Sequence, residues 1–241
     1  MHKAPKMLIT GATSGIGWAL AVAAVQAGYV VGVTGRRKER LQALQHQLGK
    51  QRCHIAAFDI TAPDATKHLN NLAKRMGGLD IFVANAGTGY VESALNHAQE
   101  RATLEVNVLA FYESVHWAAT TFVHQGHGHL VGITSFATTH ANSYTPMYNA
   151  TKAFNARYLA GLRRWLQRYG HAVAVTDIRP GFVASEMTDG IPGKFWEAPA
   201  DVAARAILAA IQRRARVAYI TRRWGWLAQV VKVLDFFGYA P

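Results

Sequence analysis

A glycine-rich turn stands between a strand-like run and a helical run near the start of the chain. Residues 7–10 read MLIT, an apolar strand, and residues 11–17 read GATSGIG before the helical run that begins at Trp18. Glycines let the backbone turn tightly, and the first N–H groups of a helix are free to bind an anion. A strand, a glycine-rich turn and a helix in this order are typical of folds that bind the pyrophosphate of a dinucleotide.

Strand-like and helical segments alternate along the rest of the chain, with no internal repeat and no linker. This alternation predicts one α/β domain: a single doubly wound (Rossmann) parallel sheet with helices on both faces. We place this domain at 1–221, including a substrate loop at about 182–199, and a separate apolar and basic tail at 222–241. The strands are expected at 7–10, 29–34, 53–60, 79–87, 129–135, 171–183 and 217–221.

The composition favours a cytoplasmic protein with an anionic ligand. Half of the 241 residues are hydrophobic, which is enough for one core. The single cysteine excludes an intrachain disulfide and favours a reducing compartment. We see no signal-peptide pattern and no run of about 18 apolar residues that could span a membrane. The net charge of +12 favours phosphorylated cofactors, acidic lipids or nucleic acid as partners.

Two arginines follow the second expected strand. In a dinucleotide-binding fold, an acid there binds the 2′-hydroxyl of NAD, whereas an arginine accommodates the 2′-phosphate of NADP. This chain has Arg36 and Arg37, and its first acid there is Glu39. A guanidinium binds phosphate through a planar fork, so we predict NADP(H) rather than NAD(H), with Arg36 the first choice. The alternative is two solvated charges at the start of a surface helix.

A tyrosine and a lysine share one helical face in the second half of the chain. Tyr148 and Lys152 are four residues apart, which places them about one turn apart. A free tyrosine has a pKa of about 10, and an ammonium one turn away is expected to lower it toward neutrality. Ser135, at the end of the preceding strand, is placed to hydrogen-bond a substrate oxygen held against the tyrosine. The alternative is a tyrosine and a lysine on the surface without a chemical role.

Other polar residues have two interpretations each. Asp59 ends a strand, where it contacts the adenine or caps the next helix. Asn85 ends another strand, where its amide holds a backbone turn or closes around the cofactor. Asn107 interrupts a helix expected from Ala98 to Val123 and indicates a kink or a bound water. We expect no metal site, because the spacing of three histidines in a glycine turn matches no familiar ligand set: His124, His127 and His129.

Taken together, these motifs resemble the short-chain dehydrogenase/reductase family over almost the whole chain. The matches to the family's motifs, in chain order, are Thr10, Gly11, Gly15 and Gly17, then Asn85, Ala86 and Gly87, then Asn107, Ser135, Tyr148 and Lys152, and finally Pro180, Gly181 and Val183. Three positions depart from the family pattern. Ala84 stands where a second asparagine is frequent, Ser185 stands where a threonine is frequent, and Ser14 occupies a position that is often basic in NADP-dependent members.

The resemblance implies hydride transfer between a nicotinamide and a carbonyl or alcohol carbon, the chemistry of EC 1.1.1. It implies that Tyr148 is the general acid/base, that Ser135 orients the carbonyl and that Lys152 binds the nicotinamide ribose and lowers the tyrosine pKa. Asn107 would hold a water that links the lysine to solvent. The expected cofactor-binding residues are Gly11, Thr13, Ser14, Gly15, Ile16, Gly17, Arg36, Arg37, Asp59, Asn85, Ala86, Gly87, Tyr148, Lys152, Pro180, Gly181, Val183 and Ser185.

The tail has an apolar pattern of its own. Leu227, Val230, Val231 and Leu234 repeat at helical spacing after two arginines. Either this stripe packs on the body or on a second subunit, or it makes a peripheral contact with a membrane. Its aromatic neighbours are Trp224, Trp226, Phe236 and Phe237.

Other functions and assemblies compete with the oxidoreductase. A non-catalytic dinucleotide-binding scaffold, or a protein that binds a membrane or nucleic-acid surface, is the main alternative. All four tetrad positions are present, however, and no nucleic-acid-binding module is recognisable, so we expect a small-molecule substrate and no nucleic acid. Epimerases and dehydratases of the same fold are usually longer. By analogy with the family, we expect a homodimer or homotetramer formed through the helices that contain Asn107 and Tyr148.

Overall fold

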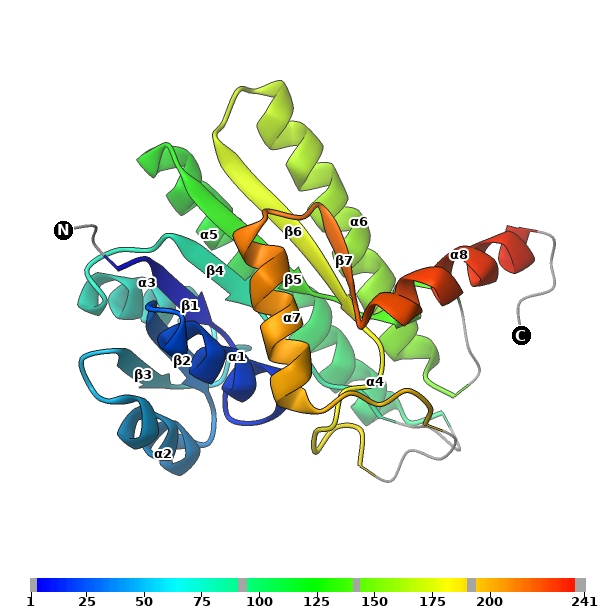
Figure 1. The fold of residues 1–241 in the computed structure, drawn as a ribbon, viewed down its shortest axis with the longest axis horizontal. Coiled ribbons are helices and arrows are strands. Elements are labelled where there is room, and N and C mark those ends of the chain that lie inside the picture. The colour runs from blue at the N-terminus through cyan, green and yellow to red at the C-terminus, as the bar shows by residue number, and fades with distance from the viewer. Residues whose placement is uncertain (1–3, 91–94, 141–143, 190–193, 237–241) are drawn as a thin grey trace.

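A parallel sheet forms the centre of the molecule (Figure 1). The computed structural model describes residues 4–90, 95–140, 144–189 and 194–236, and within these ranges the sheet has seven strands in the order β3-β2-β1-β4-β5-β6-β7. The prediction of a doubly wound parallel sheet is confirmed. The strands are β1 (Lys6–Ile9), β2 (Val30–Gly35), β3 (Cys53–Ala57), β4 (Ile81–Ala84), β5 (Gly128–Ile133), β6 (Val173–Pro180) and β7 (Val217–Ile220).

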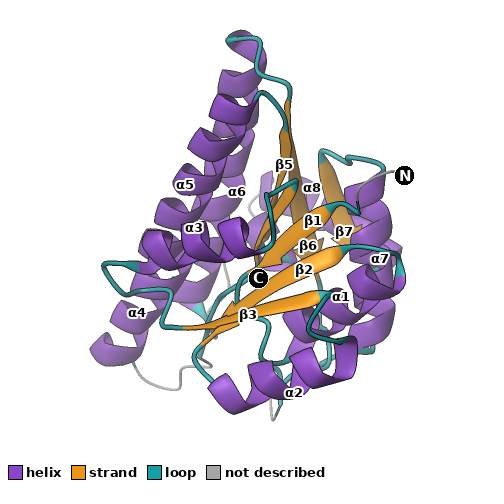
Figure 2. Cartoon of the chain, turned by 90° about the vertical axis from the view of Figure 1, so that its left-hand side faces the viewer, coloured by secondary structure: helices purple, strands orange, loops and turns teal. Residues whose placement is uncertain are grey.

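Helices cover both faces of this sheet (Figure 2). Helices α1, α2 and α7 bury apolar side chains in one core, and α3, α5 and α6 do so in the other. The bounds are α1 (Gly15–Gln26), α2 (Lys38–Leu48), α3 (Ala65–Arg75), α4 (His97–Leu104), α5 (Phe111–Gln125), α6 (Pro146–Arg168), α7 (Ala200–Gln212) and α8 (Arg222–Phe236).

The first strand shows why the sheet is covered on both sides. Successive side chains of a strand point to opposite faces. Met7 and Ile9 belong to the core under α1, α2 and α7, whereas Leu8 belongs to the core under α3, α5 and α6, and all three are fully buried. The apolar run from Met7 to Ile9 is therefore buried on both sides only in the middle of a two-sided sheet.

The strand order reverses at β1, which pairs with β2 on one side and β4 on the other. In open parallel sheets a crevice forms at such a switch point, beyond the carboxyl ends of the strands. The glycine turn follows β1, Arg36 and Arg37 follow β2, Asn85 follows β4 and Ser135 follows β5. The topology therefore brings the predicted site residues to one edge of the sheet.

The helix expected from Ala98 to Val123 is divided. It consists of α4, a π-helical segment from Glu105 to Ala110, and α5. Asn107, where the sequence indicates a kink or a bound water, lies inside the π-helical segment. A π-helical turn changes the direction in which side chains leave a helix and is frequent at functional sites.

Helix α8 projects from the body (Figure 1), and its contacts differ from the expected stripe. Leu227 and Val231 are half-buried, whereas Val230 and Leu234 are exposed. The reason is that the helix packs through its first turns, where Trp224 and Ala228 are buried. Of the loop and tail predicted above, residues 190–193 and 237–241 lie outside the described residues. Across the described ranges, no helix is both long and apolar enough to cross a membrane.

Candidate active site

A cavity of about 420 Å³ lies at the carboxyl edge of the sheet. The expected cofactor residues line it, except for Gly17, and so do three members of the predicted tetrad: Ser135, Tyr148 and Lys152. Asn107, the fourth member, does not line the cavity. Further lining residues include Thr88, Val106, Met187 and Thr188.

The glycine turn between β1 and α1 requires glycine for both conformation and space. Gly11 and Gly15 have φ values of 68° and 54°, in the region that residues with a Cβ rarely adopt. An added Cβ at Gly11 would lie 2.7 Å from the Cα of Ala86. At Gly17 it would lie 2.5 Å from the carbonyl oxygen of Gly11. Gly17 therefore allows close packing within the turn, outside the cavity. Gly11 and Gly15 line the cavity and leave its wall free of side chains at these positions.

Asn85 holds the turn after β4 against the glycine turn. Its Nδ2 donates to the carbonyl oxygens of Thr10 and Gly11 at 2.8 and 3.0 Å. In return, the hydroxyl of Thr10 accepts from the backbone N–H groups of Asn85 and Ala86 at 3.0 and 3.1 Å. The amide thus fastens a backbone turn, which was one of its two interpretations, and it also lines the cavity.

Arg37 is held at one end of the cavity by two hydroxyls and a carboxylate. Its Nη2 donates to the hydroxyls of Thr13 and Ser14 at 2.8 and 2.9 Å. Its Nη1 pairs with Glu186 Oε2 at 2.6 Å, and Arg40 pairs with the other oxygen of the same carboxylate. The guanidinium is therefore preorganised at the cavity wall, with an anion already bound to it.

Arg36 and Asp59 face each other across the same end of the cavity. Arg36 Nη1 lies 3.9 Å from Asp59 Oδ2, and its side chain is largely exposed. Asp59 Oδ1 accepts from the backbone N–H and the hydroxyl of Thr61 at 2.9 and 2.8 Å. Helix α3 instead begins after Asp64, so Asp59 does not cap it. The helix cap, one of the two interpretations of Asp59, is therefore wrong. Asp59 lines the cavity, where the other interpretation places it.

Ser135, Tyr148 and Lys152 meet at the other end of the cavity. Ser135 follows β5, and its hydroxyl accepts from the N–H of Ala137 at 3.1 Å, which begins a short 3-10 turn. Tyr148 lines the same cavity, and the Ser135 side chain acts to lower the pKa of its hydroxyl. Lys152 Nζ donates to the carbonyl oxygen of Ile133 at 3.1 Å and lies 5.5 Å from the centroid of the Tyr148 ring. The spacing along α6 places both side chains in the cavity.

The expected effect of the lysine on the tyrosine is wrong in this structure. Burial raises the pKa of Tyr148, and the hydrogen bond from Ser135 opposes this shift only in part. Burial also lowers the pKa of Lys152 to about 8, against the attraction of Asp177. A phenolate loses its hydration at this depth, and that cost exceeds the benefit of its neighbours. The Tyr148 hydroxyl is therefore neutral at neutral pH.

Asn107 does not line the cavity but hydrogen-bonds Thr88, which does. Its Oδ1 accepts from the N–H of Thr88 at 2.9 Å, and its Nδ2 donates to the carbonyl oxygen of Thr88 at 2.8 Å and to Thr151 Oγ1 at 3.1 Å. The side chain is buried. Asn107 thereby ties the strand-end backbone at Thr88 to the helix that carries Tyr148 and Lys152.

The loop after β6 is fastened to the body at several points. Val183 bridges Ala198, and Thr188 Oγ1 donates to the carbonyl oxygen of Val183 at 2.9 Å. Farther along the loop, the rings of Phe195 and Trp196 pack against Trp224 of α8, with centroids 5.1 and 5.8 Å apart. The loop thus connects the cavity to the start of α8.

Two charged residues at this site were not predicted from the sequence. Glu186 lines the cavity, and it binds Arg37 and Arg40. The sequence holds no local signal for these pairs, because Glu186 is 149 residues from Arg37 and 146 from Arg40. The three histidines near the start of β5 do not form a cluster in the structure: His124, His127 and His129. His129 lies within β5, and its ring hydrogen-bonds to Thr176 Oγ1 at 2.8 Å.

Comparison with known proteins agrees with this geometry. The family model described as short chain dehydrogenase matches residues 5–194. A serine 3-dehydrogenase from Agrobacterium fabrum is 39% identical over 188 residues, which cover 76% of this chain and 73% of the relative.

Two solved structures share the whole fold. A short-chain dehydrogenase from Sphingobium yanoikuyae in complex with NADPH is 26% identical, with a TM-score of 0.81 and coverage of 96% of this chain and 95% of the other. A short-chain dehydrogenase/reductase from Burkholderia phymatum in complex with NAD is 18% identical, with a TM-score of 0.88 and coverage of 99% and 96%. The likeness to the Burkholderia phymatum structure concerns the fold alone. The family match over most of the chain, together with the relatives, shows that the chain is an oxidoreductase of the short-chain dehydrogenase family.

Proposed function

We propose that the chain is an NADP(H)-dependent oxidoreductase that moves a hydride between the nicotinamide and a carbonyl or alcohol carbon of a small molecule. One observation carries this proposal. The hydroxyls of Ser135 and Tyr148 lie together at one end of a cavity whose other end is lined by Arg36 and Arg37. A proton donor and a phosphate-binding fork in one cavity are what this reaction needs.

The residues of the cavity fit a dinucleotide. Gly11 and Gly15 keep the wall at the start of α1 free of side chains, and a helix N-terminus favours a pyrophosphate. Arg37 is aimed at the cavity by Thr13 and Ser14, which supports a bound 2′-phosphate. The Sphingobium yanoikuyae relative was solved with NADPH, and this also supports the choice of NADP(H).

The residues at the other end have distinct roles in the proposal. The bound cofactor supplies the hydride in reduction and accepts it in oxidation. In reduction, Tyr148 donates its proton to the oxygen that becomes the alcohol, and its raised pKa keeps that proton in place until it is needed. Ser135 orients the same oxygen. Lys152 is a cation below a pH of about 8 and holds the nicotinamide ribose. Asn107 is a positioning residue, because it fixes Thr88 and Thr151.

Binding and turnover test this function separately. The purified chain is titrated with NADPH and with NADH by energy transfer from its tryptophans, and aldehydes, ketones and L-serine are then screened for turnover. We expect tighter binding of NADPH. Tyr148→Phe should retain NADPH binding and lose most of the turnover, whereas Tyr158→Phe, which changes another tyrosine of α6, should retain both. Unchanged turnover in Tyr148→Phe would refute the assigned role, and binding of neither cofactor would favour a non-catalytic scaffold.

We further propose a cytoplasmic homo-oligomer. The outer face of the helices around Asn107 and Tyr148 exposes several large apolar side chains, which supports a subunit interface there. Light scattering of the purified chain measures the assembly, and a monomer at micromolar concentration would refute it. The exposed residues of this face are Leu104, Leu109, Tyr112, Phe154 and Trp165.

A further inference from the structure

Helix α8 has two apolar stripes that face in different directions. Trp224 and Ala228 are four residues apart and buried, with Trp224 only 2% exposed. Trp226, Val230 and Val233 follow at spacings of four and three residues and are 80%, 56% and 56% exposed. Residues at these spacings share one side of a helix. One stripe therefore fastens α8 to the body, and the other is presented to the surroundings.

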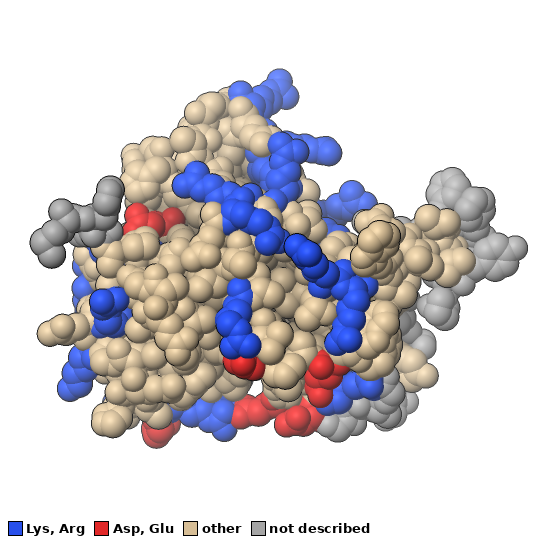
Figure 3. All heavy atoms as spheres, in the orientation of Figure 1, with Lys and Arg blue, Asp and Glu red and all other residues tan. Residues whose placement is uncertain are grey.

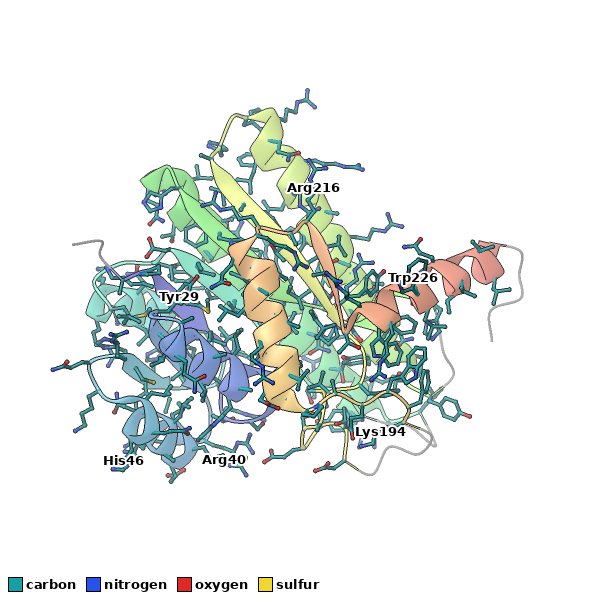
Figure 4. The ribbon with its side chains drawn as sticks, viewed as in Figure 1. Tyr29, Arg40, His46, Lys194, Arg216 and Trp226 are labelled. Carbon is teal, nitrogen blue, oxygen red and sulfur yellow. The ribbon has the colours of Figure 1, made fainter. Side chains whose placement is uncertain are left out.

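The inward stripe packs the base of α8 against the body. The ring of Trp224 lies 4.7 Å from that of Phe136 and 5.8 Å from that of Phe182, in addition to its contacts with the loop after β6. Figure 4 labels Trp226 on the helix that leaves this aromatic cluster. Because the base packs against the body through Trp224, the opposite side of α8 faces away from it.

Positive charge surrounds the base of this helix. The sequence from Val202 to Leu234 contains six arginines and one lysine and no acidic residue. Figure 3 shows basic side chains in a diagonal band across the face that carries α7 and β7, toward the base of α8. No ion pair within the described ranges involves the five exposed arginines that flank β7: Arg213, Arg214, Arg216, Arg222 and Arg223.

The combination of this charge with an exposed tryptophan favours one kind of partner. Basic residues beside a stripe of tryptophan and aliphatic side chains match a bilayer interface, where the rings lie at the headgroup level and the cations meet acidic lipids. A nucleic acid would use the arginines but not Val230 and Val233. A second copy would bring the same arginines against these, and like charges oppose that contact.

We propose that the outward stripe of α8 and the arginines that flank β7 dock the protein peripherally on an anionic lipid surface. Docking involves no insertion across the bilayer, since the 15 residues of α8 extend only about 22 Å. It is independent of the proposed reaction. The flanking arginines give long-range attraction, and the stripe of Trp226, Val230 and Val233 gives the apolar contact that persists when salt screens the charges.

Flotation of the full chain with vesicles tests this proposal. The vesicles are phosphatidylcholine alone and phosphatidylcholine with 30% phosphatidylglycerol. We expect the parent chain to float with the acidic vesicles and to remain at the bottom with the neutral ones. Trp226→Ser/Val230→Ser should lower the partition coefficient by about tenfold or more. Arg213→Gln/Arg216→Gln should lower it by a similar factor at low salt.

A matched variant controls for the general loss of apolar surface. Leu95→Ser/Tyr169→Ser removes two other exposed apolar side chains, distant in sequence from α8, and should float like the parent. Thermal unfolding checks that every variant folds. The proposal is overturned if the folded parent does not bind acidic vesicles, or if the α8 variant binds them as the parent does. It is also overturned if the α8 variant only converts an oligomer into a monomer, which would make a second copy the partner.

Discussion

Replacement of Gly181 by alanine should destabilise the protein through one side chain, Trp224. Gly181 follows β6 and lines the cavity, and its φ lies outside the left-handed region, so an alanine causes no backbone strain there. The added Cβ would lie 1.9, 2.2 and 2.3 Å from three atoms of the Trp224 ring. Ordinary contact begins at 3.4 Å, so the ring must retreat by about 1.5 Å. The Trp224 ring is buried among other aromatic rings, so it cannot move outward into solvent.

The expected cost is that of an overpacked core, about 1–3 kcal/mol. For a chain of this size each kcal/mol lowers the melting temperature by roughly 2–4 °C, so Gly181→Ala should melt about 2–12 °C lower than the parent. Near-ultraviolet circular dichroism is the appropriate probe, because it follows the tryptophan environment directly. Gly161→Ala is the matched control: no heavy atom lies within 4 Å of its added Cβ, and as a residue inside α6 it should gain about 0.5–1 kcal/mol.

A double-mutant cycle decides whether the ring is the cause. In the Trp224→Ala background the obstacle is absent, so the further change Gly181→Ala should cost almost nothing. The coupling free energy should therefore be about 1 kcal/mol or more. An equal cost of Gly181→Ala in both backgrounds, or a melting temperature equal to that of the parent, would refute the reasoning.

Three further predictions concern the charged groups of the cavity. Arg37→Ala should raise the Kd for NADPH about tenfold, through loss of a charged hydrogen bond, and leave the Kd for NADH nearly unchanged; a parallel loss for both cofactors in fluorescence titrations would contradict this. Glu186→Gln should lower the Kd for NADPH about two- to fivefold in the same titrations, because the phosphate no longer competes with a carboxylate for Arg37, and a higher Kd would count against that competition. Burial lowers the pKa of Lys152 from 10.5 to about 8, so between these pH values the unfolded chain binds more protons than the folded one. Its free energy of unfolding should then rise with pH across that window relative to Lys152→Met, as measured by urea titration, and parallel pH profiles would refute the shift.

The sequence predicted the features that depend on local pattern. The glycines of the first turn, the four-residue spacing of Tyr148 and Lys152, and the alternation of strands and helices each follow from short-range geometry. Because parallel strands deliver their carboxyl ends to one edge, placement of the turns in order was enough to bring Asn85 and Ser135 to one cavity. The irregular helix at Asn107 was also visible as an amide in an apolar run.

The features that were missed depend on depth and on distant partners. The pKa of Tyr148 is decided by burial, which the spacing to Lys152 does not report. The pairing of Glu186 with Arg37 joins loops from opposite halves of the chain. Likewise, the stripe predicted in α8 is divided between half-buried and exposed positions. Gly181 leaves room for the Trp224 ring, and this ring lies on the side of the helix that faces the body.

The loop after β6 connects three binding surfaces that a designer would prefer to adjust one at a time. Glu186 joins it to the arginines, Met187 places it in the cavity wall, and Trp196 joins it to the base of α8. A ligand that withdraws Arg37 from Glu186 shifts the conformational equilibrium of the loop. By thermodynamic reciprocity, a shift in that equilibrium changes the affinity for the ligand by the same factor. Selection for a new substrate in this loop should therefore shift the ratio of NADPH to NADH use, even when no residue that contacts the cofactor is changed.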